Sequence, residues 1–308
     1  MRVRLTCVLL GIALAPLGCD RIQALKDQLV SSPKQQEGGA DPELEVVKNL
    51  YEGGRYDEAL STVAAVIQAN PGSAEALYYK GLCHLARAGG ADPSAPVSPL
   101  SPLSEDESAS LEAFDRALSI NPRHAPSAIG IGDLYSRRVP AKRRARAAND
   151  DPQDPFVLAS AAYEKAVGID PKLPEAQQHY ARFLERTGQL DLAESAYKAS
   201  VEAAAVVPEI APDYYLAYGR FLSGPRDRLD AALEQFQLAQ VFRADDPAIQ
   251  QEIAIVHSRV GIRHFEKQEY LVAEEALKKA DSLFTDRSSP DAQKTTETLE
   301  RLHSIRRR

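Results

Sequence analysis

The sequence has few of the residues from which active sites are built. Its 308 residues include three cysteines and six histidines. Only Cys83 lies beyond the first twenty residues, so the body of the chain has no intramolecular disulfide framework. The histidines do not occur at the spacing of a zinc site, and the sequence shows no phosphate-binding glycine loop and no nucleophile elbow. We therefore predict no catalytic residue, no metal site and no cofactor.

Basic residues are also in the minority. The chain has 37 Lys and Arg residues against 44 Asp and Glu residues, a formal net charge of −7. A nucleic-acid-binding domain usually has a basic excess, so we expect no nucleic-acid partner. Tryptophan is absent and methionine occurs once. Alanine and leucine are abundant and β-branched runs are few, which favours an all-α fold.

The N-terminus has the layout of an export signal. Arg2 and Arg4 precede an apolar run, residues 5–15, that is too short to span a bilayer as a stable helix. The run is followed by small residues and Cys19. This segment resembles a bacterial lipoprotein signal, in which cleavage before a cysteine accompanies diacylglycerol modification of its thiol. Gly18 and Cys19 match that pattern, whereas Pro16 stands where a branched aliphatic residue is usual.

The resemblance implies that residues 1–18 are removed and that Cys19 is lipidated. The protein would then be exported and anchored to a bacterial membrane, facing the periplasm, with the choice of inner or outer membrane left open. An ordinary signal peptide with Cys19 unmodified is the alternative. Residues 19–40 are rich in Ser, Gln and Gly and are expected to be a flexible tether.

A helical unit recurs along the rest of the chain, with a period of about 34 residues that is typical of a helical solenoid. A small residue opens the second helix of each unit at Ala59, Ser110, Ala159, Ala193, Ala232 and Ala273. A bulky residue follows one turn later at Val63, Phe114, Tyr163, Tyr197, Phe236 and Leu277. One position of the first helix also has a small residue in five of the six units, at Gly81, Gly132, Ala181, Gly219 and Gly261. The first unit departs from this pattern, with Val47 at the same position. A proline closes three of the units at Pro71, Pro122 and Pro171.

With these positions the chain resembles the tetratricopeptide-repeat (TPR) family. The resemblance implies an all-α, right-handed superhelical solenoid of about six helix-pair repeats over residues 41–287. A capping helix is expected over residues 288–308, because terminal repeats need a polar outer face. Its apolar stripe would be Leu299, Leu302 and Ile305, and Thr295 would face away.

Protein or peptide ligands are the partners that the resemblance implies, bound in a concave groove lined by the first helices. Carrying the groove positions of the family to this chain selects Leu44, Lys48, Tyr51, Tyr78, Leu82, Ile129, Asp133, Gln178, Arg182, Arg220 and Phe265. The mixture of apolar side chains with two arginines suits an amphipathic or extended peptide with an acidic end. The Lys and Asn set of the chaperone-binding members is absent. Alternatively, some of these side chains, Leu82 and Ile129 especially, are simply packed between helices.

Two intervals between repeats are longer than the others. The extra residues fall in a Pro- and Ser-rich segment, about 89–106, and in a segment of about 137–154. The second segment has a basic cluster, Lys142, Arg143, Arg144 and Arg146. Both insertions lie between the helices of a pair and would emerge on the same edge of the stack. We hypothesise that they form a joint patch for a partner. The alternative is two solvated loops, which cost little stability.

These observations together predict a non-catalytic, lipid-anchored scaffold or adaptor of the bacterial cell envelope. It would serve an assembly, secretion or pilus-type complex, or act as a protease adaptor. A peptidoglycan- or glycan-associated structural lipoprotein is the alternative. The identity of the partner and the oligomeric state do not follow from the sequence.

Overall fold

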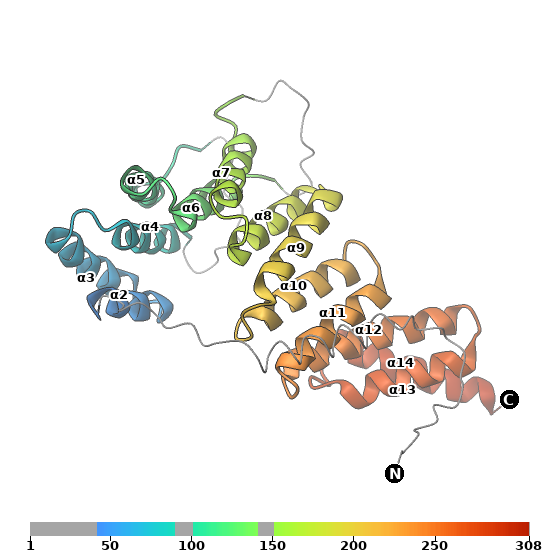
Figure 1. Ribbon diagram of the computed structural model, residues 1–308. Coiled ribbons are helices and arrows are strands. Elements are labelled where there is room, and N and C mark those ends of the chain that lie inside the picture. The colour runs from blue at the N-terminus through green and yellow to red at the C-terminus, as the bar shows by residue number, and fades with distance from the viewer. Residues whose placement is uncertain (1–41, 90–100, 141–150, 308) are drawn as a thin grey trace, which may run out of the picture. The chain divides into compact units, whose positions relative to one another are not determined.

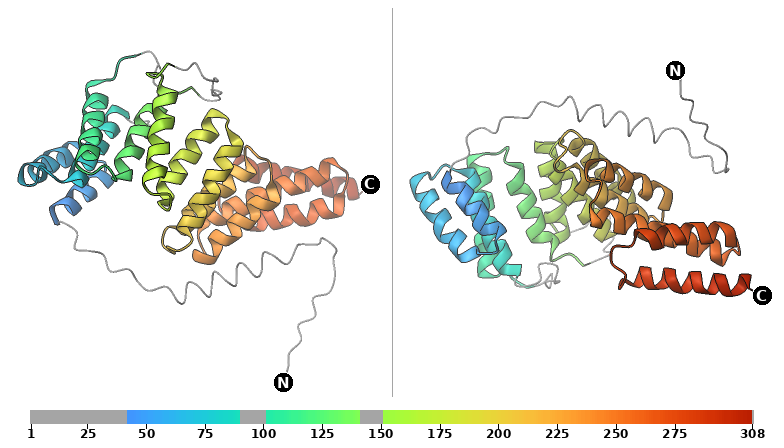
Figure 2. Two further views of the ribbon diagram at one scale, coloured as in Figure 1. Left: turned by 45° about the horizontal axis from the view of Figure 1, so that its top comes forward. Right: turned by 90° about the horizontal axis from the view of Figure 1, so that it is seen from below.

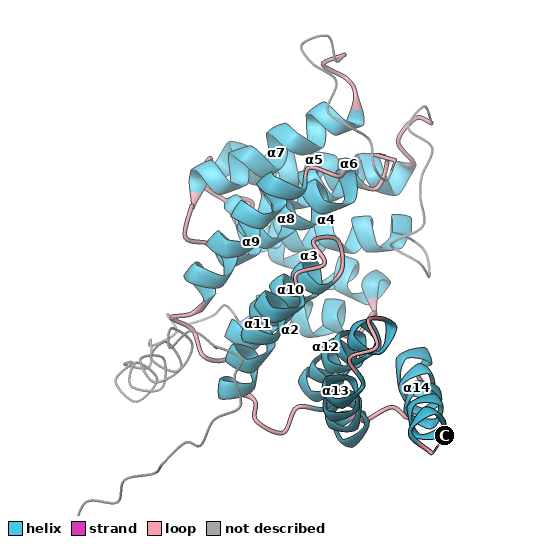
Figure 3. Ribbon diagram, turned by 90° about the vertical axis from the view of Figure 1, so that its right-hand side faces the viewer, coloured by secondary structure: helices cyan, strands magenta, loops and turns pink. Residues whose placement is uncertain are grey.

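The computed structural model describes residues 42–89, 101–140 and 151–307. Thirteen α-helices and no strand occur within these ranges (Figure 3). The predicted signal segment 1–18, the tether 19–40 and the basic cluster of Lys142, Arg143, Arg144 and Arg146 lie outside the described residues.

The helices form six pairs followed by one last helix (Figure 1). The first helices of the pairs are α2 (Pro42–Glu52), α4 (Ala74–Gly89), α6 (Ala125–Ser136), α8 (Pro174–Thr187), α10 (Ala211–Ser223) and α12 (Pro247–Glu266). The second helices are α3 (Tyr56–Ala69), α5 (Glu105–Ile120), α7 (Pro155–Ile169), α9 (Leu190–Ala204), α11 (Leu229–Phe242) and α13 (Tyr270–Leu283). The last helix is α14 (Pro290–Arg306). The predicted all-α solenoid of six helix pairs is confirmed.

Each helix contacts the helices before and after it in the chain, so that the pairs stack in sequence order (Figure 2). Each first helix also contacts the first helix of the next pair, from α2 with α4 to α10 with α12. Within the described ranges, no second helix contacts another second helix. Successive first helices therefore form one continuous face of the stack.

Glycines let the two helices of a pair approach each other closely. A Cβ atom added at Gly81 or at Gly219 would lie 2.4 Å from a ring carbon of Phe114 or Phe236. Both rings are fully buried. Since real Cβ atoms do not approach other atoms so closely, any larger residue forces the aromatic ring or the helix to move. This steric requirement explains why small residues recur in the first helices.

Phe114 contacts a glycine on each side. A Cβ atom at Gly130, in the first helix of the following pair, would also lie 2.4 Å from the Phe114 ring. The bulky residue of one pair thus fills the space toward the next pair. The repeat pattern in the sequence did not select Gly130 as a position that must be small. The small residue that opens the second helix is fully buried in all six pairs. The stack is continuous because each pair completes the core of its neighbour.

Turns and helix ends follow from local sequence. Ser104 and Glu107 form a capping box at the start of α5, in which each side chain bonds the backbone of the other. Asp154 and Asp246 each accept a hydrogen bond from a backbone N–H two residues on, at the starts of α7 and α12. Gly188 ends α8 with a positive φ of 84°, a conformation that glycine adopts at little cost.

The face that the capping helix α14 buries matches the prediction only in part. Thr295, expected to face away, is fully buried, and its hydroxyl lies 2.6 Å from the Ser258 hydroxyl of α12. Leu302 is buried as predicted, but Ile305 is 41% exposed. The prediction was wrong for Ile305 and for Thr295. Hydropathy alone does not show that a buried threonine can bond Ser258 and the backbone oxygen of Asp291.

Candidate functional site

A cavity of about 950 Å³ lies along the first helices of the second, third and fourth pairs. Its walls come from the region where α2 turns into α3 and from α4, α6, α7 and α8. The apolar and small lining residues are Tyr51, Gly54, Tyr56, Leu82, Leu85, Ala86, Tyr163 and Phe183. The polar and charged ones are Asp133, Ser136, Arg137, His179, Arg182 and Arg186. This volume is in the range of known ligand pockets.

One wall of the cavity is aromatic and aliphatic. The ring centroids of Tyr51 and Tyr56 are 5.8 Å apart, and Tyr51 also packs edge-on against Tyr79 at 6.4 Å. Burial raises the pKa of Tyr51, and its neighbour Tyr56 adds to this rise. Leu82 of α4 adds an aliphatic side chain to the lining of the same cavity. Such a wall favours the side chains of bulky apolar residues.

Asp133 of α6 is the acidic residue of the cavity lining. Its Oδ1 accepts a hydrogen bond from the Tyr163 hydroxyl at 2.7 Å and lies 2.9 Å from His179 Nδ1. Burial lowers the pKa of His179, but the Asp133 carboxylate more than offsets this effect and the net pKa is raised. The pairing therefore favours the protonated form of the His179 ring.

Two arginines of the cavity bind main-chain oxygens. Arg137 donates to the carbonyls of Leu85 and Ala88, at 3.3 and 3.4 Å, near the C-terminal end of α4. Arg186 donates in the same way to the Ser136 carbonyl at the end of α6. The C-terminal end of a helix carries partial negative charge, so each guanidinium stabilises the end of the preceding first helix. Carbonyl oxygens carry no full charge, and the cavity keeps both positive charges.

Arg182 differs from these two arginines. It lies one turn before Arg186 on α8 and is exposed to solvent. Within the described ranges it has no hydrogen bond and no ion pair. It is therefore the arginine of the cavity lining whose donors are all left unused by the described residues.

Solved structures show which fold this arrangement belongs to, although no protein-family model and no curated protein matches the chain. PilW, a widely conserved type IV pilus biogenesis factor, matches with a TM-score of 0.52 and 16% sequence identity, over 83% of this chain and 100% of that one. TTC0263, a thermophilic TPR protein of Thermus thermophilus, matches with a TM-score of 0.50 and 20% identity, over 70% of this chain and 96% of that one. The chain has the TPR fold. At these identities the likeness concerns the fold alone.

The TPR array brings four of the predicted groove residues together. Tyr51, Leu82, Asp133 and Arg182 line the cavity. Three others lie outside the lining. Lys48 is half-buried on α2, and Arg220 forms an ion pair with Glu252 at 2.6 Å. Tyr78 packs among the rings of Tyr79, Phe114 and His124. Of the remaining positions, Ile129 and Gln178 are buried, Leu44 packs on the core around Val47, and Phe265 packs on Tyr270. One family position thus has different environments in different repeats.

Sequence reasoning missed several residues of the cavity. The groove pattern selects only certain positions in the first helices. Tyr56 is outside it because this residue begins the second helix α3, and His179 is next to a selected position but not at one. Arg137 and Arg186 are outside it because they lie at or beyond the ends of α6 and α8. A signal for the two arginines was present. Each stands five residues after the small residue of its unit, Gly132 or Ala181. Their common position reflects their common role of binding the end of the preceding first helix of the TPR array.

A second feature of the array is a contact between the described ends of the two insertions. Arg138, at the start of the second insertion, donates to the carbonyls of Ser101 and Pro102 at the end of the first, at 2.5 and 3.1 Å. Arg138 also bonds Glu107 of α5 at 2.6 Å. The end of one insertion is therefore held against the start of the other by one buried guanidinium.

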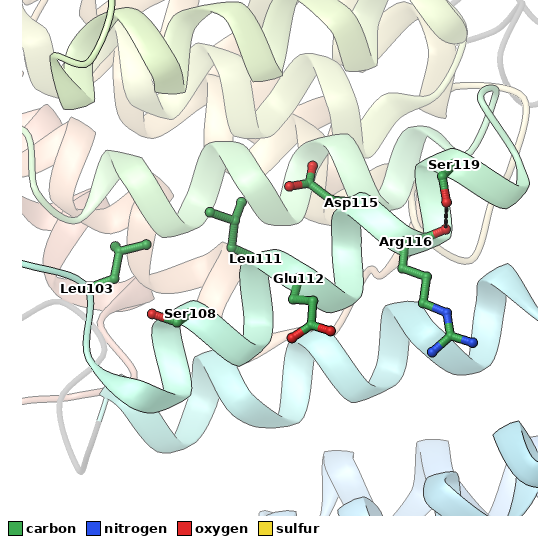
Figure 4. A pocket seen from close by; sticks show the side chains of 7 residues that line it. All are labelled: Leu103, Ser108, Leu111, Glu112, Asp115, Arg116 and Ser119. Carbon is green, nitrogen blue, oxygen red and sulfur yellow. Dashed lines mark hydrogen bonds between the residues drawn. The ribbon is translucent and has the colours of Figure 1, made fainter.

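Another hollow lies along the outer side of α5 (Figure 4). Figure 4 shows that its side chains come from α5 and from Leu103 just before it. Glu112 and Asp115 are exposed. Because one helix supplies nearly all of this surface, no opposing wall surrounds a ligand. We regard the hollow along α5 as a weaker candidate than the cavity.

The described ranges include no group of three or more His, Cys, Asp or Glu side chains that could hold a metal ion. Cys83 is buried, and burial raises the pKa of its thiol to about 11, which disfavours the reactive thiolate. Among the helices described here, none is long and apolar enough to cross a membrane.

Proposed function

We propose that this protein is a non-catalytic scaffold that binds a polypeptide partner in the cavity lined by residues of α2, α3, α4, α6, α7 and α8. The observation that carries the proposal is the cavity itself, whose lining combines the aromatic rings of Tyr51 and Tyr56 with the arginines around Arg182. Polypeptide ligands offer apolar side chains and hydrogen-bonding groups together, and grooves of this composition suit them. Scaffolding requires binding and no bond chemistry.

We further propose that the scaffold is anchored in a bacterial envelope through a lipid on Cys19. The sequence around Cys19 supports this proposal, because it resembles a lipoprotein signal. A single acyl chain holds a protein at a membrane only weakly, and a second chain makes the attachment firm. The likeness of the fold to PilW, a type IV pilus biogenesis factor, is in keeping with a role in assembling an envelope complex.

Crosslinking in membranes tests the role of the cavity. The wild-type chain, a Tyr51→Ala/Arg182→Ala variant and an Arg220→Ala control would be crosslinked in intact cells and purified. We expect the same partner with wild type and control, and its loss with the cavity variant. Arg220 is a matched control because it is also an exposed first-helix arginine, but outside the cavity. A partner captured equally by all three would show that binding occurs elsewhere.

Labelling with a fatty acid tests the anchor. Cells expressing wild type, Cys19→Ala or the Cys83→Ala control would be grown with labelled palmitate and fractionated. We expect Cys19→Ala alone to lose both the label and the membrane association. A labelled Cys19→Ala protein would overturn the proposed anchor.

A further inference from the structure

We infer that the polypeptide bound in the cavity presents a carboxylate beside a bulky apolar side chain, and that Arg182 binds this carboxylate. The inference rests on the proposed function and assigns the ligand class and the contact residue of the same site. It follows from three features of the cavity: its charge, the availability of Arg182 and the position of the aromatic wall.

The charge of the cavity favours an acidic ligand. Asp133 is the acidic side chain of the lining, and it is already bound to His179 and to the Tyr163 hydroxyl. Arg137 and Arg186 bind main-chain carbonyls, which carry no full negative charge. With Arg182, the lining has three arginines against one carboxylate. The cavity is therefore electropositive, and a ligand carboxylate is attracted to it.

Arg182 is placed to make the direct contact. Arg137 and Arg186 donate hydrogen bonds to carbonyl oxygens at helix ends. Arg182, by contrast, is exposed and is bonded to none of the described residues. Its planar guanidinium can bind both oxygens of a carboxylate at once, which an ammonium group cannot do as well. The neighbouring positive charge of Arg186 strengthens this attraction and excludes basic ligands.

The aromatic wall sets the second requirement. Tyr51, Tyr56 and Leu82 line the same cavity as Arg182. An acidic residue alone would leave this wall exposed to water, while an adjacent phenylalanine, tyrosine or leucine would cover it. The cavity should therefore bind a peptide in which an apolar residue is adjacent to the acidic one more tightly than a peptide with acidic residues alone.

Selection from a library of random linear peptides tests the inference. The purified full-length chain would be immobilised, and messenger-RNA-displayed peptides would be selected on wild type, Arg182→Glu and the Arg220→Glu control. We expect wild type and control to enrich peptides with Asp or Glu near an aromatic or leucine residue. The Arg182→Glu variant should instead enrich neutral or basic peptides. Circular dichroism of each variant checks that the exposed substitutions leave the helices intact.

Affinities of the best wild-type peptide then measure the contact. We expect Arg182→Glu to weaken binding about tenfold or more, and Arg182→Lys to weaken it less, because lysine keeps the charge and loses the planar geometry. Replacement of the peptide's acidic residue by its amide should have an effect similar to that of Arg182→Glu. The Arg220→Glu control should stay within about twofold of wild type.

The outcomes separate this inference from the proposed function. Selected peptides that bind Tyr56→Ala poorly but show no acidic preference would overturn the inference and leave the polypeptide-binding cavity in place. Failure to enrich any peptide over an unrelated protein would overturn both. Displacement of the selected peptides, with equal affinity, by a synthetic peptide of residues 20–41 would show that the chain itself supplies the occupant, which also overturns the inference.

Discussion

The guanidinium of Arg138 lies 2.6 Å from the carboxylate of Glu107, and their side chains are only 4% and 5% exposed. The same carboxylate accepts the backbone N–H of Ser104 in the capping box of α5. Burial raises the pKa of Glu107, but the bonds from Ser104 and Arg138 outweigh burial and the pKa is lowered overall. This ion pair connects the two insertions with the start of α5.

Breaking this ion pair should be costly. We expect Arg138→Met to lower the free energy of unfolding by about 3–5 kcal/mol, because it leaves the Glu107 charge buried and unpaired. The double variant Arg138→Met/Glu107→Leu should recover a large part of that loss, since it buries no charge. Urea denaturation measures both. Arg301→Met is the control, because its pair with Glu297 is exposed on α14 and should contribute less than about 1 kcal/mol.

Two glycines should respond in opposite directions to the same substitution. Gly219→Ala would place a Cβ atom 2.4 Å from the Phe236 ring, and we expect a loss of about 1–3 kcal/mol of stability. Gly168→Ala, in α7, meets no atom within 4 Å and should raise stability by up to about 1 kcal/mol, because alanine favours the helix. Thermal unfolding of both variants measures the difference. Equal effects would mean that close helix approach does not explain the glycine positions.

Attachment of the capping helix should depend on one buried threonine. Thr295→Val keeps the shape of the side chain but removes the hydroxyl that bonds Ser258. We expect a loss of about 1–2 kcal/mol, because Ser258 is then left without this buried partner. Thr296→Val is the control, since Thr296 is the next residue of α14 but is exposed. Hydrogen exchange of α14 amides should increase in Thr295→Val and stay unchanged in the control.

His257 should make the fold sensitive to acid. Its Nε2 is buried and has no hydrogen-bond partner in the described part of the chain. Burial, with a smaller contribution from Lys279, lowers the pKa of His257 from 6.5 to about 4. Between these two values the unfolded chain binds a proton that the folded chain does not bind. Stability is therefore fully present above pH 6.5, falls as the pH drops through this window, and levels off below the folded pKa.

A comparison of two proteins isolates this effect. Wild type should lose up to about 2–3 kcal/mol more stability than His257→Leu between neutral pH and pH 4, because only wild type has the titrating group. Denaturant titrations at several pH values measure this difference, and acidic groups shared by both proteins cancel. Parallel stability curves for the two proteins would contradict the prediction.

The candidate site was only partly predictable. Arg182 and Arg220 are equivalent in the sequence pattern, since both are arginines of a first helix. The structure distinguishes them, because Arg220 has Glu252 as a neighbour and Arg182 lies in the cavity. Tyr78 was predicted to face a ligand and packs against other rings instead. A repeat position specifies a face of the helix, but the neighbours on that face come from other repeats.

The sequence by itself determined the helix pairs and their order. Small residues such as Gly81 and Ala159 must recur where two helices touch, and prolines such as Pro122 end the second helices, so local sterics leave a readable period. The tertiary structure alone decided which side chains share a cavity. Arg182, Tyr56 and Asp133 come from three different pairs, and their proximity depends on how the pairs stack. That stacking results from contacts between many side chains that lie far apart in the chain. Such contacts leave no pattern in any short segment of the sequence.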